Sequence, residues 1–304
     1  MKTNPRDETR GLWLGLLGVV IFAMTLPMTR LAVGPVGDPQ LPPLFVTAGR
    51  AAFAGLLSLL YLRVTGAPRV QRRHLAALAT SALGTVVGFP LFLSLALRQV
   101  DAMHAAVVTG LMPLATAVAA AIFFRQRPSN GFWACAVLGC AMVLAFAAWR
   151  GDGRLSGADG LLLLAVASTA VGYVAGARVA SELPAEQVIC WVLVISLPLT
   201  LPWALATWPV APVRASAWGG FVYVTLFSMW LGFFAWYRGL ALGGTVRVSQ
   251  VQLVQPFLAL LFAVPVLGET LDATTVLFSL AVIAVVFVSK KMPASVPVLQ
   301  PGNP

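Results

Sequence analysis

The chain has 304 residues, of which 59% are hydrophobic and 10% are charged, and its formal net charge is +10. A soluble domain would carry about a quarter charged residues, so this composition excludes one and favours a helical protein that crosses a lipid bilayer several times. In a soluble protein the positive charge would favour nucleic-acid binding. Here no basic segment is interleaved with aromatic residues, so we expect no nucleic-acid partner.

Apolar stretches of about twenty residues, the length that crosses a hydrocarbon core of about 30 Å, follow one another along the chain. We predict ten spans, at residues 12–33, 43–62, 75–97, 102–124, 131–149, 159–180, 187–208, 216–242, 245–267 and 271–289. Residues 12–149 and 159–289 then form two groups of five spans, with short tails at 1–11 and 290–304. The short connections leave no room for a soluble domain.

Small residues within these spans predict close helix contacts. Glycines recur four residues apart at Gly11 and Gly15, Gly84 and Gly88, Gly172 and Gly176, and Gly239 and Gly243. The three cysteines all fall in apolar runs, and an odd number of embedded thiols indicates neither a disulfide framework nor a zinc site.

The Lys and Arg residues are divided unequally between the two sides of the membrane. If the N-terminus is cytoplasmic, the cytoplasmic side carries thirteen of them and the opposite side carries five. Cytoplasmic loops of membrane proteins are enriched in Lys and Arg, so we predict that both termini are cytoplasmic.

The ninth span has an unusual sequence, and the fourth span is a weaker copy of it. Residues 249–270 contain three glutamines followed by Pro256, and in the fourth span Thr109 and Pro113 occupy the places of Gln252 and Pro256. Since five spans per copy is an odd number, the second copy enters the membrane from the opposite side, an arrangement used for alternating access. We therefore predict an all-α membrane protein with ten transmembrane helices in two five-helix inverted-topology repeats.

Two motifs, together with this duplication, carry a resemblance to a known family. The second span opens with Gly49-Arg50-Ala-Ala-Phe-Ala54, and Gln255-Pro256 is followed by Gly268-Glu269. The chain resembles the drug/metabolite transporter superfamily in its EamA-domain branch. It departs from that pattern in the first copy, which has Arg125-Gln-Arg127 where Gly-Glu is expected.

The resemblance implies a multi-pass carrier of small metabolites in the bacterial inner membrane, working without a cofactor as a monomer or weak dimer. The eighth span of this chain is rich in aromatic residues, and the chain looks most like the exporters of aromatic amino acids. Those aromatic residues are Trp230, Phe233, Phe234, Trp236 and Tyr237.

The charged residues are interpreted mainly as structural. No Asp or Glu is clearly embedded in a span, so we expect no carboxylate-based proton-coupling site, which disfavours a multidrug-cation antiporter. His104 could carry protons, but we favour an interfacial histidine hydrogen-bonded near Asp101. Glu269 is interpreted as a cap of the tenth helix, and Arg50 as structural. Arg247 is expected to extend its charge to the membrane interface.

Neutral side chains are the better binding candidates. Gln252 and Gln255 are three residues apart and share a helix face. We predict an amphipathic cavity near the midplane for small molecules, amino acids above all, lined by Thr25, Phe89, Ser94, Thr109, Tyr173, Trp236, Gln252 and Gln255. Structural or gating roles are assigned to Pro90, Pro113, Pro256 and Glu269. Helix breaks at Pro90 and Pro256 would turn backbone dipoles toward the charged ends of a zwitterion.

Three alternatives remain open. A nucleotide-sugar or phosphate-ester carrier would call for several Lys or Arg in the cavity. A carrier of drug-like solutes is the second alternative. An intramembrane enzyme would need embedded acids or a His-metal set, and the two histidines lie in different spans without ligand spacing, so we expect no metal.

Overall fold

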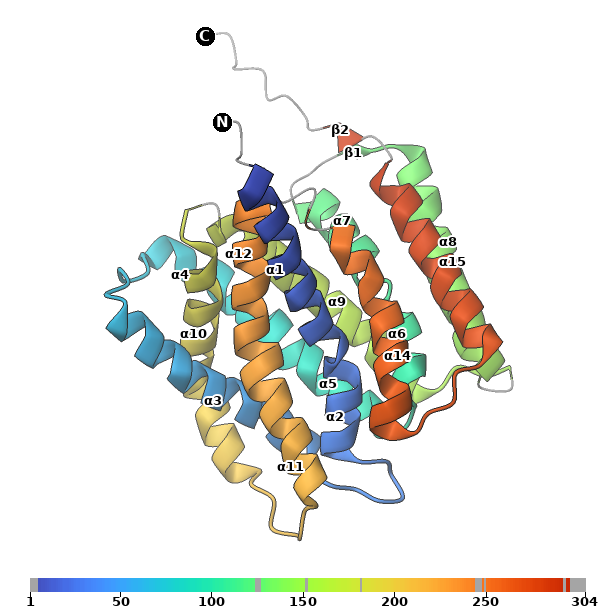
Figure 1. The fold of residues 1–304 in the computed structure, drawn as a ribbon, viewed down its shortest axis with the longest axis horizontal. Helices are drawn as coiled ribbons and strands as arrows, with labels where there is room; N and C mark the ends of the chain where they lie inside the picture. Colours follow the sequence, from blue (N-terminus) through green and yellow to red (C-terminus); the bar gives the residue numbers. More distant parts are fainter. Residues whose placement is uncertain are drawn as a thin grey trace.

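The computed structural model describes residues 5–123, 127–150, 153–180, 182–243, 248, 250–291 and 294–295. These residues fold almost entirely into helices. The exception is a short antiparallel strand pair, β1 (Arg127–Pro128) with β2 (Ala294–Ser295). Arg247 lies outside the described residues. The start of α1 and the strand pair lie at the same end of the bundle (Figure 1).

The first half of the chain forms five spans, three of them composite. The first consists of α1 (Pro5–Ala23) and α2 (Thr25–Val33), and α3 (Pro43–Val64) is the second. The third joins α4 (Arg72–Ser81), the π-helix η1 (Ala82–Gly88) and α5 (Phe89–Ala96). The fourth is split into α6 (Ala102–Thr109) and α7 (Met112–Phe123), and α8 (Asn130–Arg150) is the fifth.

The second half has the same order of spans, except that its first span is one continuous helix. Its elements are α9 (Gly157–Ala180), α10 (Ala185–Ala206), α11 (Ala215–Val222), the π-helix η2 (Tyr223–Leu231), α12 (Gly232–Gly243), the 3-10 helix η3 (Gln250–Val254), α14 (Gln255–Leu267) and α15 (Ala273–Lys290). Eight helical stretches of the described chain are long and apolar enough to cross a membrane, and the shorter apolar helices Val251–Leu267 and Ala273–Ser289 complete the ten. The predicted all-α membrane fold is confirmed.

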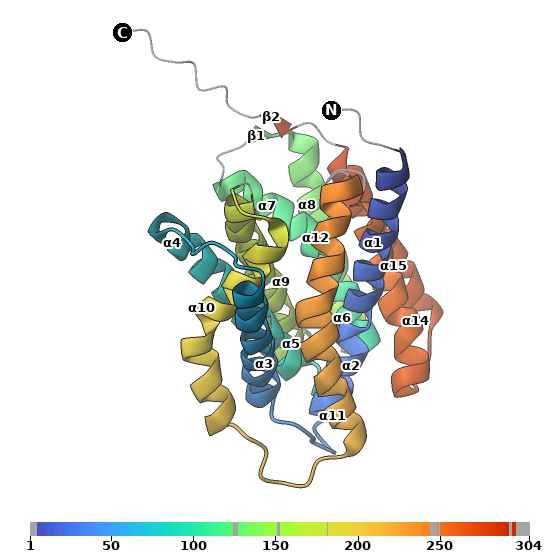
Figure 2. The ribbon, with the colours of Figure 1, turned by 60° about the vertical axis from the view of Figure 1, so that its left-hand side comes forward.

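The helix pairs follow the symmetry of an inverted repeat. The second span packs on the seventh (α3 on α10), and the fifth packs on the tenth (α8 on α15). The first span packs on the eighth through α1 and α12, which lie side by side in both views (Figures 1 and 2). Exchanging the two halves converts that pair into the sixth and third spans. These also pack on one another, α9 against α4, η1 and α5. These eight spans therefore have the partners that exchanging the two halves would give them, and the fourth and ninth spans pack on one another through α6 and α14.

Glycines allow close backbone approach at two equivalent helix crossings, that of α1 with α12 and that of η1 with α9. A Cβ atom added to Gly239 of α12 would lie 2.6 Å from the backbone N of Gly15 in α1. One added to Gly84 of η1 would lie 2.8 Å from the Cα of Gly172 in α9. Real Cβ atoms do not approach other atoms so closely, so the predicted glycine contacts are confirmed at these four positions.

The irregular segments also occur in matching places. The π-helices η1 and η2 lie within the third and eighth spans, and the fourth and ninth spans change conformation just before Pro113 and Pro256. Pro256 lies in the first turn of α14, where the missing N–H of proline costs no hydrogen bond. The expected break at Pro90 is absent. Pro90 instead lies in the first turn of α5, and the widened turns of η1 lead into it without interrupting the helix.

Candidate functional site

A cavity at the interface of the two repeats encloses about 620 Å³ of space, including its part open to solvent. Its wall comes from seven spans, four of the first repeat and three of the second. Six of the eight predicted binding residues line it: Thr25, Phe89, Thr109, Tyr173, Gln252 and Gln255.

The structure places the other two predicted binding residues outside the cavity wall. Ser94 is fully buried in α5, and its hydroxyl has no hydrogen-bond partner in the described part of the chain. Trp236 lies at the crossing of α12 with α1, and its Cβ is 3.1 Å from where a Cβ on Gly18 would lie. On α12 it is Phe233, three residues earlier, that reaches the cavity.

A second hollow of about 410 Å³ lies between the two interrupted spans. Pro113 of the fourth span and Pro256 of the ninth both line it, together with Gly110 at the break between α6 and α7. It shares five wall residues with the central cavity: Leu26, Thr109, Met112, Gln252 and Gln255. The irregular segments that precede Pro113 and Pro256 therefore meet beside the central cavity.

Arg50 of α3 is a wall residue whose position we did not anticipate from the sequence. Its side chain is buried, with 2% of the residue exposed, and it lines the cavity. Nη2 donates a hydrogen bond of 3.2 Å to the Oγ of Ser228, and that oxygen lies 2.8 Å from Oγ1 of Thr25. Nε and Nη1 of Arg50 have no partner in the described part of the chain.

The sequence did contain a signal for Arg50. A charged residue in the middle of a span costs about 2.5–3.5 kcal/mol on insertion scales, and such residues commonly face a cavity and serve function. Arg50 is flanked by small and apolar residues, Gly49 and Ala51, within the second span. Its charge therefore has to be compensated by tertiary contacts or by a ligand.

The remaining polar groups of the wall are neutral. Oε1 of Gln255 and Oγ1 of Thr169 are buried without a partner among the described residues. Thr109 differs because its hydroxyl donates to the carbonyl of Ala105 one turn earlier, at 2.7 Å. No described wall residue is an Asp or Glu. The cavity therefore has one positive group, Arg50, and several uncharged hydrogen-bonding groups.

Glu269 makes contacts other than those predicted. Its Oε1 accepts a hydrogen bond of 2.7 Å from the backbone N–H of Ala102, and its Oε2 accepts one of 2.8 Å from Met103. It thus caps α6 in the first repeat instead of the tenth helix. Asp272, directly before α15, caps that helix by accepting a hydrogen bond of 2.9 Å from the N–H of Thr275.

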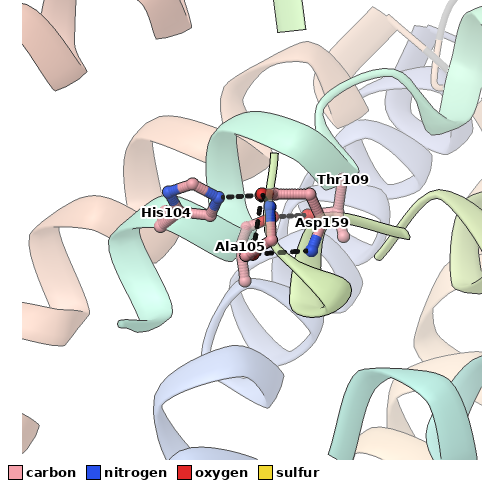
Figure 3. Close-up of polar contacts among 5 residues, drawn as sticks. His104, Ala105, Thr109 and Asp159 are labelled. Atoms are coloured by element: carbon pink, nitrogen blue, oxygen red, sulfur yellow. Dashed lines mark hydrogen bonds and ion pairs between the residues drawn. The ribbon is translucent and has the colours of Figure 1, made fainter. Parts of the chain in front are cut away.

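His104 also has a partner that we did not expect from the sequence. Its Nε2 lies 2.7 Å from Oδ1 of Asp159, in the first turn of α9 (Figure 3). Oδ2 of Asp159 accepts hydrogen bonds from the N–H and hydroxyl of Ser156, at 2.8 and 2.7 Å. The exposed fractions of His104 and Asp159 are 8% and 4%. Asp159 is therefore a buried carboxylate, and Asp101 faces Arg30 instead, at 3.8 Å.

We refer to Glu269, Asp159 and His104, with the first turn of α6, as the α6 cluster. Glu269 and Asp159 belong to the second repeat, whereas α6 belongs to the first. The cluster lies near the end of α14 that is opposite the start of α1 (Figures 1 and 2). It therefore joins the two repeats at one end of the bundle.

Ten apolar helices in two inverted repeats with a shared central cavity are the architecture of a membrane carrier. The sequence pattern of the EamA-like transporter family matches residues 9–147 and 157–290, and the chain belongs to this family. The chain is 40% identical over 290 residues to a Bacillus subtilis (strain 168) protein named "Uncharacterized transporter YdeK", covering 94% of this chain and 99% of that protein.

A solved crystal structure supports the fold. It superposes with a TM-score of 0.62 at 18% sequence identity, covering 92% of this chain and 98% of the other. The protein described here is thus an EamA-family membrane transporter with a multi-pass helical fold.

Proposed function

We propose that the protein exports small amphipathic metabolites, most of all amino acids including aromatic ones, across the bacterial inner membrane. The observation that carries this proposal is the central cavity lined by both repeats, next to the irregular segments before Pro113 and Pro256. A cavity shared by two inverted repeats can open to either side when one repeat moves relative to the other. We take residues 12–149 and 159–289 as these repeats, with both tails in the cytoplasm.

The composition of the wall supports an amphipathic solute. Phe22, Phe89, Tyr173 and Phe233 offer apolar and aromatic surface, and the amides of the ninth span offer hydrogen bonds. Aromatic side chains pack favourably against one another in offset or edge-to-face arrangements. An amino acid with an aromatic side chain has both kinds of surface in one small molecule.

A flux assay in proteoliposomes tests this proposal. Purified full-length protein should exchange radiolabelled L-phenylalanine with saturable kinetics. Gln252→Ala should raise the KM about tenfold, the effect of losing about 1.4 kcal/mol of hydrogen bonding to the solute. Gln99→Ala is the matched control, because Gln99 is exposed and the side-chain hydrogen bond described for it is one of 3.4 Å to the carbonyl of Leu95 in the preceding helix. Rates no higher than those of protein-free liposomes, for every amino acid tried, would refute the proposal.

The same assay addresses coupling. The described cavity wall contains no carboxylate that could exchange a proton for the solute. We therefore expect L-phenylalanine to move down its own gradient at the same rate with and without a pH gradient. A rate that depends strongly on the pH gradient would show that protons are coupled through another group.

A further inference from the structure

Arg50 is a buried cation with unused hydrogen-bonding capacity. A guanidinium group has five N–H donors, and the described contacts of Arg50 use one of them, to Ser228 at 3.2 Å. Nε and Nη1 are buried without a partner in the described chain. Burying an unpaired charge is costly, and buried polar groups are nearly always satisfied. A partner for this group is therefore missing from the protein's own described side chains.

The missing partner should be an anion in the cavity. None of the ion pairs formed among the described residues includes Arg50, and no described wall residue is acidic. The hydroxyl of Ser228 accepts a hydrogen bond from Nη2 and is itself hydrogen-bonded to Thr25, which limits the movement of the guanidinium plane. A planar guanidinium held in this way suits a planar carboxylate, which can accept two parallel hydrogen bonds from it.

We propose that Arg50 binds the carboxylate of the transported solute and thereby selects its chemical class. The cavity then takes amphipathic monocarboxylates, amino acids among them, and discriminates against their amides, their esters and organic cations. One cation matches one carboxylate, and an organic cation entering the same cavity would be repelled. This inference rests on the proposed function, since the cavity must be where the solute binds.

The wall also has groups for the other end of an amino acid. Oε1 of Gln255 and Oγ1 of Thr169 are oxygen atoms without partners among the described residues, and both residues line the same cavity as Arg50. Either oxygen can accept a hydrogen bond from an ammonium group. A zwitterion would satisfy the cation and these acceptors together, whereas a simple carboxylic acid would satisfy only the cation.

Binding of three related probes to purified full-length protein in nanodiscs tests the proposal. The probes are L-phenylalanine, L-phenylalaninamide, which lacks the carboxylate, and 3-phenylpropionate, which lacks the ammonium group. We expect the wild-type protein to bind L-phenylalanine at least about tenfold more tightly than the amide, as charge-assisted hydrogen bonds require. It should also bind 3-phenylpropionate more tightly than the amide.

Variants assign the preference to Arg50. Arg50→Gln should weaken L-phenylalanine binding by about 10- to 100-fold and leave amide binding unchanged, so that the ratio between the two approaches one. Arg50→Lys should keep part of the preference, since it keeps the charge but not the planar fork. Arg214→Gln is the matched control, because Arg214 is an exposed arginine paired with Asp38 outside the cavity. It should leave all three affinities unchanged.

Two results would overturn the inference: equal binding of acid and amide by the wild-type protein, or a preference for the acid that survives in Arg50→Gln. The comparison of acid and amide binding uses the wild-type protein alone, so it tests the inference even if Arg50→Gln does not fold. Saturable L-phenylalanine flux without any preference for the acid would refute this inference and leave the proposed function intact. Absence of flux for every amino acid would refute the proposed function itself.

Discussion

The central cavity and the α6 cluster are both buried polar regions, but they differ in how their polar groups are satisfied. In the α6 cluster both oxygens of Glu269 and both oxygens of Asp159 accept hydrogen bonds from the protein. In the cavity Arg50 and Gln255 keep polar atoms without partners among the described residues. A buried network satisfied by the protein itself stabilises the fold, whereas one left unsatisfied beside a cavity is ready for a ligand.

The α6 cluster also differs from its counterpart in the other repeat. Glu269 follows the ninth span and caps the start of the fourth, across the boundary between the repeats. In the first copy the sequence has Arg125-Gln-Arg127 in the corresponding place and so offers no carboxylate there. The first copy therefore has no acidic residue at the position that corresponds to Glu269, although the helix packing is symmetric.

The largest effect on stability should come from removing the Glu269 carboxylate. Glu269→Ala leaves the N–H groups of Ala102 and Met103 without their acceptors at a partly buried helix start. We expect the free energy of unfolding to fall by about 2–3 kcal/mol. Equilibrium denaturation in mixed micelles with SDS measures it. The control is Asp7→Ala, which removes an exposed carboxylate from the first turn of α1 and should change stability by less than about 0.5 kcal/mol.

A smaller but specific effect should come from the pair of His104 and Asp159. A double-mutant cycle with His104→Phe and Asp159→Asn isolates their interaction, and phenylalanine keeps a ring to pack on Phe146, whose centroid is 5.2 Å from that of His104. We expect a coupling energy of about 1–2 kcal/mol, because the pair is almost fully buried.

An exposed pair provides the comparison for that cycle. Arg73 and Glu182 approach to 2.6 Å, but their side chains are 63% and 44% exposed. Coupling between exposed charges is typically below about 1 kcal/mol because water screens it. Equal coupling energies in the two pairs would show that burial of the α6 cluster does not strengthen its contacts.

Much of the fold could be predicted from the sequence. Span length and hydropathy located the ten helices, and the odd number of spans in each copy implied inversion. The glycine contacts where α1 crosses α12 and η1 crosses α9 could also be predicted, because glycine lacks a side chain that would hold two helix backbones apart. These features depend on local composition or on counting, which a single sequence contains in full.

The contacts of individual side chains could be predicted less well. Trp236 follows the nine-residue π-helix η2, which has more residues per turn than an α-helix, so an α-helical period carried through the span misjudges which face Trp236 occupies. Glu269 and His104 bond to residues far away in the chain, and distance along the sequence suggested nearer partners. The position of Arg50 in the cavity wall could not be predicted, because it depends on how seven spans surround the side chain.

The cavity should respond to substitution in the opposite way to the α6 cluster. Gln255→Met replaces an amide whose Oε1 has no described partner with an apolar side chain of similar size. Stability should stay within about 0.5 kcal/mol of wild type, since no hydrogen bond from this oxygen to the described protein is lost. The apparent affinity for L-phenylalanine in the flux assay should fall about tenfold.

Gln187 is the matched control for this substitution. Its Oε1 is also buried without a described partner, but it lies in α10 and does not line the central cavity. Gln187→Met should therefore leave the affinity for L-phenylalanine unchanged. If it weakened flux as much as Gln255→Met, lining the cavity would not be what distinguishes the two glutamines.

The smallest expected effect is a dependence of stability on pH that arises from Glu269, which lies in the connection between α14 and α15. Burial raises the pKa of Glu269 above its usual 4.5, and the hydrogen bonds from Met103 and Ala102 only partly oppose that shift. The folded state then holds its proton to higher pH than the unfolded state does. The extra stability that comes from the bound proton is therefore present at low pH and is lost as pH rises from 4.5 through the raised pKa, whereas the hydrogen bonds from Ala102 and Met103 to the carboxylate remain.

The pKa of Asp272, in the same connection, is shifted in the opposite direction. Burial acts to raise its pKa, but hydrogen bonds from Thr275 and the charge of Arg150 together lower it below 3.8, so its stabilising effect is lost only when pH falls below that value. Above pH 4.5 the slope of unfolding free energy against pH should thus come from Glu269. One titrating group can contribute a slope of no more than about 1.4 kcal/mol per pH unit. Glu269→Gln cannot titrate and should remove this slope, whereas Asp272→Asn should leave it. A slope that persists in Glu269→Gln would mean that a group other than Glu269 takes up the proton.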